Sequence, residues 1–181
     1  TVDAETEAWI ENNRRAGRLV VGINLHPLLV IESANVADAV AQMNAKVAES
    51  LLETSRERDI AWLMLPHDYR RETGDGVCLR PIFDAIAPQL GDRVRYFDGI
   101  RRADELKAVA AELDGVVTGR MHLAIGSLGT GTPALSLTYF DKFEGLYRHF
   151  RLPDRLLLSP ATIQQDRNFH QVLNRFIDEL P

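Results

Sequence analysis

Residues 114–125 constrain the fold most, because a short apolar run there leads directly into a helical pattern. Residues 116–117 are the apolar run, and small and apolar residues recur at helical spacing from His122 onward. Thr118 can cap the helix, and Gly119 lets the backbone approach a ligand closely. A buried strand that runs straight into a helix is therefore expected at this point of the chain.

Arg120 lies at the start of that predicted helix. The first N–H groups of a helix have no partner inside it, and they carry the positive end of the helix dipole. A cation is unfavourable in this position unless an anion is present. The stretch thus predicts an anion site, and it favours a functional rather than a structural reason for Arg120.

The rest of the chain alternates apolar runs with helical patterns. Strands are expected at residues 19–25, 60–66, 94–97, 115–118 and 134–138. Helices are expected at residues 37–52, 79–90, 103–113, from about residue 120, and at 141–150 and 162–180. Right-handed βαβ crossovers stack such units into a mostly parallel sheet. The predicted fold class is therefore α/β, doubly wound, with helices on both faces.

Length and composition predict one domain. A chain of 181 residues with 45% hydrophobic content can bury one good core. Residues 1–18 are polar, acidic at the start and basic at the end, and are interpreted as a connecting helix. Residues 19–181 then form a Rossmann-like domain. The chain begins with Thr1 instead of Met, so we expect either a processed chain or a piece of a longer protein.

Charge and cysteine content exclude several classes of function. The net charge of -5 and the scattered basic residues argue against a nucleic-acid surface. The single cysteine, Cys78, excludes an internal disulfide and a multi-thiolate zinc site. No apolar run reaches membrane-spanning length, and no signal peptide opens the chain. A cytoplasmic protein without an integral membrane segment is expected, and peripheral association with the inner face of a membrane stays open.

Several polar residues follow the predicted strands. In doubly wound sheets the ligand binds outside the carboxyl ends of the strands. His26 follows the first strand, His67 the second, and Arg120 and His122 the fourth. We expect these side chains to share one crevice, although either of the first two histidines could equally be an ordinary turn residue. The aperiodic residues 68–78 form a loop long enough to be functional.

Common catalytic motifs do not explain the chain. Residues 126–131 are rich in glycine, but they follow a helix and not a strand, so the dinucleotide-binding fingerprint fails its context test. The sequence contains no Walker motif, no Gly-x-Ser-x-Gly elbow and no metal-ligand cluster of recognisable spacing. No metal site is expected.

Three segments resemble the carboxyl-terminal signature of the polysaccharide pyruvyl transferase family. They are Gly-Arg-Met-His-Leu-Ala at 119–124, Gly-Thr-Pro at 131–133, and Leu-Thr-Tyr at 137–139 followed by Lys142 and Gly145. The apolar first strand and residues 65–67 also look familial. Two positions depart from the family's pattern. Phe140 stands where the family usually has an acid, and His26 stands where it often has an arginine.

The resemblance implies one half of a two-domain enzyme. Family members resemble B-type glycosyltransferases, with a cleft between two Rossmann-like halves, and this chain would be the carboxyl-terminal half. The implied activity moves the pyruvyl unit of phosphoenolpyruvate onto a sugar of a surface polysaccharide or glycolipid, forming a ketal. Phosphoenolpyruvate would be the donor substrate, and no further cofactor is expected. The glycan acceptor would be held by the missing N-terminal domain, so the isolated chain is expected to fold but not to catalyse transfer.

The resemblance also suggests roles for individual residues. Arg120 and the helix start would hold the phosphate or carboxylate, and His122 or His67 would be the proton donor, because a free histidine has a pKa of roughly 6.5. Substrate-binding roles are expected for five further residues, namely Gly119, His26, Thr138, Tyr139 and Lys142. The incomplete face should leave apolar residues such as Trp9, or the rim around Tyr139 and Phe140, unusually exposed.

Two other functions remain open from the sequence. A B-type glycosyltransferase half that uses a sugar nucleotide would bind a base and a ribose in the same crevice. A non-catalytic module would bind a sugar phosphate or a protein partner there.

Overall fold

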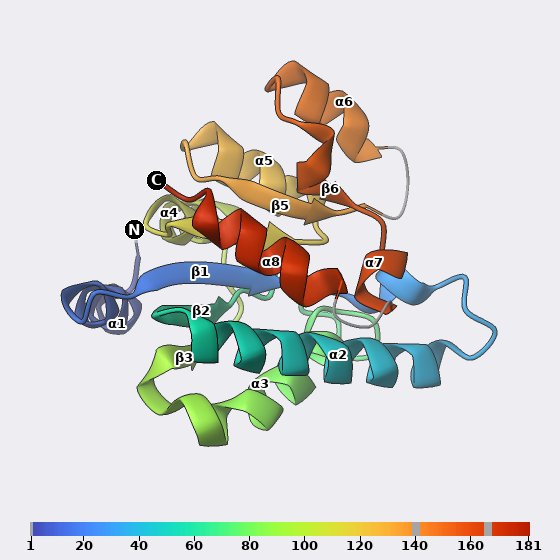
Figure 1. Cartoon of the computed structure of the whole chain (residues 1–181), viewed down its shortest axis with the longest axis horizontal. Helices are drawn as coiled ribbons and strands as arrows, with labels where there is room; N and C mark the ends of the chain where they lie inside the picture. Colours follow the sequence, from blue (N-terminus) through green and yellow to red (C-terminus); the bar gives the residue numbers. More distant parts are fainter. Residues whose placement is uncertain (1, 139–141, 165–167) are drawn as a thin grey trace.

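The centre of the protein is a six-stranded sheet in which every pair of neighbouring strands is parallel (Figure 1). The computed structural model describes residues 2–138, 142–164 and 168–181. The strand order is β3-β2-β1-β4-β5-β6. The strands are β1 (Leu19–Asn24), β2 (Ile60–Met64), β3 (Val94–Tyr96), β4 (Gly115–Thr118), β5 (Ala134–Leu137) and β6 (Leu157–Leu158). The doubly wound α/β fold predicted from the sequence is confirmed.

Helices cover the sheet on both sides. The α-helices are α1 (Ala4–Arg15), α2 (Val36–Glu57), α3 (Gly76–Leu90), α4 (Ala103–Ala111), α5 (Met121–Gly129), α6 (Lys142–His149), α7 (Ala161–Gln164) and α8 (Asn168–Asp178). Short 3-10 turns lie at η1 (Pro27–Val30), η2 (Gly91–Arg93) and η3 (Asp154–Leu156).

Alternation along the strands explains the two layers. Val21 and Ile23 of β1 point into a core formed with α2, α3 and α8. Val20, the residue before Val21, points into the opposite core, which is formed with α1, α4 and α5. In Figure 1 α2 and α8 lie side by side on the near side of the sheet. Because both faces of the strand are buried, its sequence reads as a continuous apolar run.

The strand order reverses between β1 and β4. The chain passes from β1 to β2 and β3 in one direction, and from β4 to β5 and β6 in the other. The register pairs Asn24 with Thr118, so the carboxyl ends of β1 and β4 lie side by side. Loops that leave these two ends diverge, and this is where doubly wound sheets bind ligands.

Some element boundaries differ from those predicted. α2 continues to Glu57 instead of ending at residue 52, because Thr54 and Ser55 are polar but buried. Ser55 Oγ donates a hydrogen bond to Leu51 O and accepts one from Trp62 Nε1, which satisfies both polar groups inside the core. β6 was not predicted, because two residues are too short to show a strand period. Residues 162–180, predicted as one helix, contain α8 and most of α7 in the described part.

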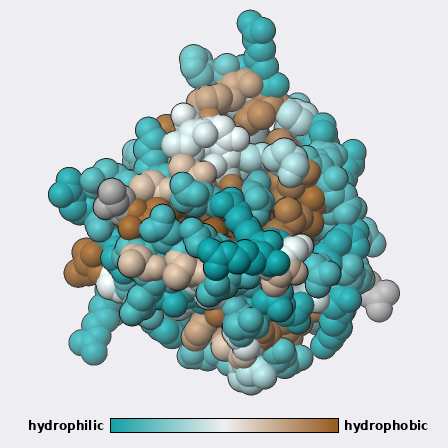
Figure 2. Space-filling view, turned by 90° about the vertical axis from the view of Figure 1, so that its left-hand side faces the viewer, coloured by the Kyte–Doolittle hydropathy of each residue, from teal (hydrophilic) through white to brown (hydrophobic). Residues whose placement is uncertain are grey.

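The polar helix α1 packs on the sheet. Ile10 is buried in the core beside β1, and Trp9 Nε1 donates a hydrogen bond of 2.7 Å to Asp92 O. Trp9 is half-buried, so the expectation that it would be unusually exposed is wrong. The side that carries α1 and both ends of the chain is mostly hydrophilic, with small hydrophobic patches (Figure 2). The boundary at residue 18 stays a prediction, and Tyr139 and Phe140 lie outside the described residues.

Candidate functional site

Two buried polar side chains join the ends of β1 and β4. Thr118 Oγ1 donates a hydrogen bond of 3.1 Å to Asn24 Oδ1, and Asn24 Nδ2 donates one of 2.8 Å to Leu65 O. Thr118 Oγ1 also accepts the backbone N–H of Arg120 at 2.9 Å. The prediction that Thr118 caps α5 is therefore wrong. Arg120 occupies the N-cap position of α5, and its side chain makes no capping hydrogen bond to the first N–H groups of the helix.

Asp75 is the centre of the site, and its side chain is 0% exposed. It accepts five hydrogen bonds. Its Oδ2 accepts from Asn24 Nδ2 at 2.7 Å and from the backbone N–H groups of His67 and Asp68 at 2.8 and 3.1 Å. Its Oδ1 accepts from Nε and Nη2 of Arg120 at 2.9 and 2.6 Å. The carboxylate thus joins β1, the loop after β2 and the start of α5.

Arg120 is held by two carboxylates. In addition to Asp75, its Nη2 lies 3.1 Å from Asp68 Oδ2, and its side chain is 15% exposed. Nη1 has no hydrogen-bond partner in the part of the chain that the structure describes. The two carboxylates therefore fix the orientation of the guanidinium at the start of α5.

A tight loop brings Asp68 and Asp75 together. The backbone N–H of Asp75 donates to Asp68 O at 2.9 Å, and that of Gly74 donates to Arg70 O at 2.9 Å. A Cβ atom on Gly74 would lie 2.3 Å from Arg70 O, so a larger residue does not fit without a shift of the loop. Hydrogen bonds from Arg70 hold the pKa of Asp68 down at about 2, and Arg120 contributes to this effect. Two arginines are thus paired with two aspartates.

His26 lies beneath the site and is fully buried. Its Nε2 donates a hydrogen bond of 2.9 Å to Gly119 O. Burial, together with the charge of Arg120, lowers the pKa of His26 to about 4, so the ring is neutral near pH 7. A Cβ atom on Gly119 would lie 3.0 Å from the His26 ring. The structure shows His26 supporting Gly119, and the direct contact with substrate expected for both residues stays a prediction.

His67 and His122 lie together at this edge. Their rings are nearly parallel, with centroids 6.2 Å apart and an angle of 9° between the planes. Burial lowers the pKa of His67, and the charges of Arg120 and His122 act in the same direction while Asp75 opposes them. His122 is exposed. The structure therefore brings these two predicted residues together next to Arg120, while their chemical roles stay predictions.

The remaining predicted residues follow β5. Thr138 is half-buried, and its backbone N–H donates to Leu158 O at 2.8 Å. Tyr139 lies outside the described residues, and Lys142 begins α6 but its side chain is not described. Their expected contacts with substrate stay predictions.

Two further observations concern metal-binding side chains and the Cys78 thiol. Within residues 2–138, 142–164 and 168–181, no group of three or more His, Cys, Asp or Glu side chains is placed to hold a metal ion. Burial raises the pKa of the Cys78 thiol to about 12, so the thiolate is scarce at neutral pH. In the same ranges no helix has both the length and the apolar character needed to cross a membrane.

Asp68 and Asp75 were not singled out from the sequence. Both lie in the aperiodic loop, where no hydrophobic period points to a buried position. One signal was present, because Asp75 directly precedes a helix, and aspartate is common at helix starts.

The fold and the site define a class of protein. A doubly wound sheet with an oriented arginine at a helix start beside its switch point is a Rossmann-like domain, a class in which ligands bind at this edge of the sheet. Residues 35–141 match the sequence profile of the family described as polysaccharide pyruvyl transferase, and the chain belongs to that family. The matched segment contains Asp68, Asp75, Arg120 and His122, and it leaves out His26. No curated protein compared with the chain matches it.

Proposed function

We propose that this domain is the donor-binding part of a pyruvyl transferase and that it binds phosphoenolpyruvate at the start of α5. The observation that carries the proposal is the fixed guanidinium of Arg120, with Nη1 directed to no described partner at an uncapped helix start. Membership of the polysaccharide pyruvyl transferase family supports the reaction type. The acceptor would be a sugar of a surface polysaccharide or glycolipid.

The proposed reaction converts two sugar hydroxyls into a ketal. One hydroxyl oxygen bonds to C2 of phosphoenolpyruvate while C3 takes up a proton, which turns the methylene group into a methyl group. The C2–O bond to phosphate then breaks, and the second hydroxyl oxygen bonds to C2. The sugar loses two protons in all. One balances the proton gained by C3, and the other leaves with the phosphate.

The described residues can serve this reaction in two ways. Nη1 of Arg120 and the first N–H groups of α5 can hold a phosphate or carboxylate oxygen by charge-assisted hydrogen bonds. His122 is exposed two residues after Arg120, which supports a role in which it contacts the ligand and gives a proton to C3. Stacked next to it, His67 is the second candidate for the acid.

A highly charged ligand needs more positive charge than the residues around Arg120 supply. Arg70 and Arg120 are already paired with Asp68 and Asp75, so the described cluster offers little net positive charge to a trianion. In the proposed enzyme the additional charge would come from Lys142 and from the N-terminal half that the family's architecture implies. We therefore expect weak binding of phosphoenolpyruvate to the 181-residue chain, and no transfer by this chain alone.

Calorimetric titration with phosphoenolpyruvate tests the proposal. Arg120→Lys should lower the affinity by about tenfold or more, because lysine retains the charge but cannot reproduce the fork that Asp75 orients. Arg56→Ala removes an exposed arginine from α2 and is the matched control, which should bind as the original chain does. Unfolding curves of both variants show whether each is folded.

Two results would overturn the donor assignment. One is equal affinity of the original chain and Arg120→Lys for phosphoenolpyruvate when both are folded. The other is tighter binding of a sugar nucleotide such as UDP-glucose at the same residues, which would favour a B-type glycosyltransferase half.

A further inference from the structure

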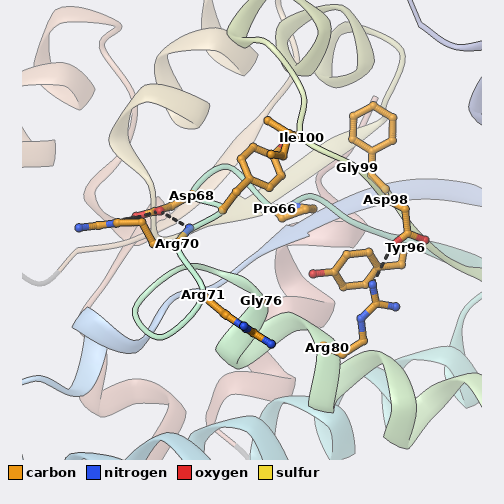
Figure 3. Close-up of a pocket in the computed structure, with 12 residues that line it drawn as sticks. Pro66, Asp68, Arg70, Arg71, Gly76, Arg80, Tyr96, Asp98, Gly99 and Ile100 are labelled. Atoms are coloured by element: carbon orange, nitrogen blue, oxygen red, sulfur yellow. Dashed lines mark hydrogen bonds and ion pairs between the residues drawn. The ribbon is translucent and has the colours of Figure 1, made fainter.

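A pocket of about 320 Å³ lies at the carboxyl ends of β2 and β3, next to the Arg120 site (Figure 3). Asp68 belongs to both places, because it lines the pocket and also contacts Arg120 Nη2 at 3.1 Å. A ligand in the pocket would therefore be separated from one at Arg120 by a single carboxylate. The volume is at the lower end for small-molecule sites, which suits one ring better than a chain of rings.

Two paired carboxylates face this pocket. Asp68 is paired with Arg70 on one side, and Asp98 is paired with Arg80 at 2.7 Å on the other (Figure 3). A carboxylate next to a guanidinium presents hydrogen-bond acceptors and donors side by side in fixed directions. Neighbouring hydroxyl groups, each of which is both donor and acceptor, match such an array.

The same pocket has an apolar part. The Tyr96 ring lines it and is fixed by Arg80, whose guanidinium carbon lies 3.7 Å from the ring centroid. Ile100 stands at the rim and is 85% exposed. A large apolar side chain so exposed next to hydroxyl-binding groups suits a ligand that has both a C–H face and polar edges. A pyranose ring has both.

We propose that this pocket holds one saccharide unit of the glycan acceptor, next to the donor at Arg120. The inference rests on the proposed function for its link to transfer. The acceptor was expected to be held by the other half of the enzyme. The pocket instead makes this domain a part of the acceptor site, so that the two reactants meet across Asp68. Bringing two reactants together in this way supplies much of the rate of a bimolecular transfer.

Amide NMR of the ¹⁵N-labelled 181-residue chain tests the pocket directly. The probes are methyl glycosides of glucose, galactose and mannose, each at high millimolar concentration. At least one should shift the backbone amides of residues 96–100 and 69–71 in a saturable manner. The amides around His170, in the pocket between α2 and α8, should not move.

Variants make the test specific. Arg71 is exposed, lines the pocket and has no ion-pair partner in the described part of the chain, so Arg71→Ala should fold normally. This variant and Ile100→Ser should each lower saccharide affinity about fivefold or more, since each removes one direct contact. Arg56→Ala on α2 should leave the saccharide affinity unchanged.

The outcomes separate this inference from the donor assignment. If phosphoenolpyruvate binds but no glycoside shifts the pocket amides, or if Arg71→Ala and Ile100→Ser bind glycosides as the original chain does, the acceptor pocket is overturned and the donor site stands. If a glycoside binds there and phosphoenolpyruvate does not bind at Arg120, the saccharide site stands and the donor assignment falls.

Discussion

The Arg120 site and the pocket between α2 and α8 both place a histidine among carboxylates, yet they differ in what holds the charges. Around His170, the side chains of Glu53 and Glu57 lie 3.5 Å from the ring nitrogens and are 32% and 48% exposed. At the other site Asp75 is 0% exposed and accepts five hydrogen bonds. The α2–α8 pocket is the larger, about 470 Å³ against about 320 Å³ beside the Arg120 site.

The two regions therefore differ in the opposite sense in pocket volume and in the burial of their charges, and the proposed function places the ligand at the edge with the buried charges. Exposed ion pairs contribute little, because water screens them and their side chains lose entropy when paired. Removing charges from water costs free energy, and only well-directed hydrogen bonds offset this cost. A buried ion pair is therefore weak evidence for stability. The buried Asp75–Arg120 pair fixes the guanidinium in one orientation, which supports the proposed role of Arg120 in binding a ligand.

The largest expected effect that tests this comparison is on stability. Asp75→Asn should lower the free energy of unfolding by about 3–5 kcal/mol, because the amide cannot accept all the N–H donors around it and Arg120 loses its buried partner. Urea denaturation followed by circular dichroism measures the change. A loss below about 1 kcal/mol would show that the cluster is not electrostatically coupled as described.

Acid sensitivity should also originate at the Arg120 edge. The pKa of His26 is about 4 in the folded chain against about 6.5 in an unfolded one, so protonation favours unfolding. The stabilising contribution is complete above pH 6.5 and is lost as the pH falls to 4, by about 3 kcal/mol in all. The lowered pKa of His67 adds a loss of the same sign. Asp68 acts only at lower pH, since its pKa falls from 3.8 to about 2.

Unfolding free energies measured between pH 7 and pH 4.5 check this prediction. His26→Gln keeps an N–H donor for Gly119 O but cannot be protonated, so its stability should change less over this range. Equal pH dependence in the original chain and in His26→Gln would assign the acid sensitivity to another group.

The smallest effect is expected at the α2–α8 pocket. Glu57→Gln makes the same carboxylate-to-amide change as Asp75→Asn, but in a side chain that is 48% exposed and bonded to Asn174 Nδ2 at 2.6 Å. The unfolding free energy should change by no more than about 0.5 kcal/mol. A thermal melt next to that of Asp75→Asn gives the comparison, and losses of similar size in both variants would remove the distinction between the two regions.

The sequence predicts those parts of the molecule in which the pattern is local. β1 and β2 were found because strands buried on both faces are continuous apolar runs. Arg120 and His122 were found because a strand runs directly into a helix there. Asp75 was missed because its partners are distant in sequence. Arg120 lies 45 residues away and Asn24 lies 51 residues away, and no local spacing records such contacts.

The loop from Asp68 to Asp75 has a consequence for redesign. The backbone N–H of Asp75 donates a hydrogen bond to Asp68 O, and both carboxylates form ion pairs with Arg120. Residues 69–71, between these two ends, line the neighbouring pocket. Tyr69 and Arg71 line the pocket without a contact to these carboxylates, whereas Asp68 and Arg70 belong to both the pocket and the ion-pair cluster. A library that randomises residues 69 and 71 and retains Asp68, Arg70, Gly74 and Asp75 could alter which ligand the protein prefers while keeping the contacts that orient Arg120.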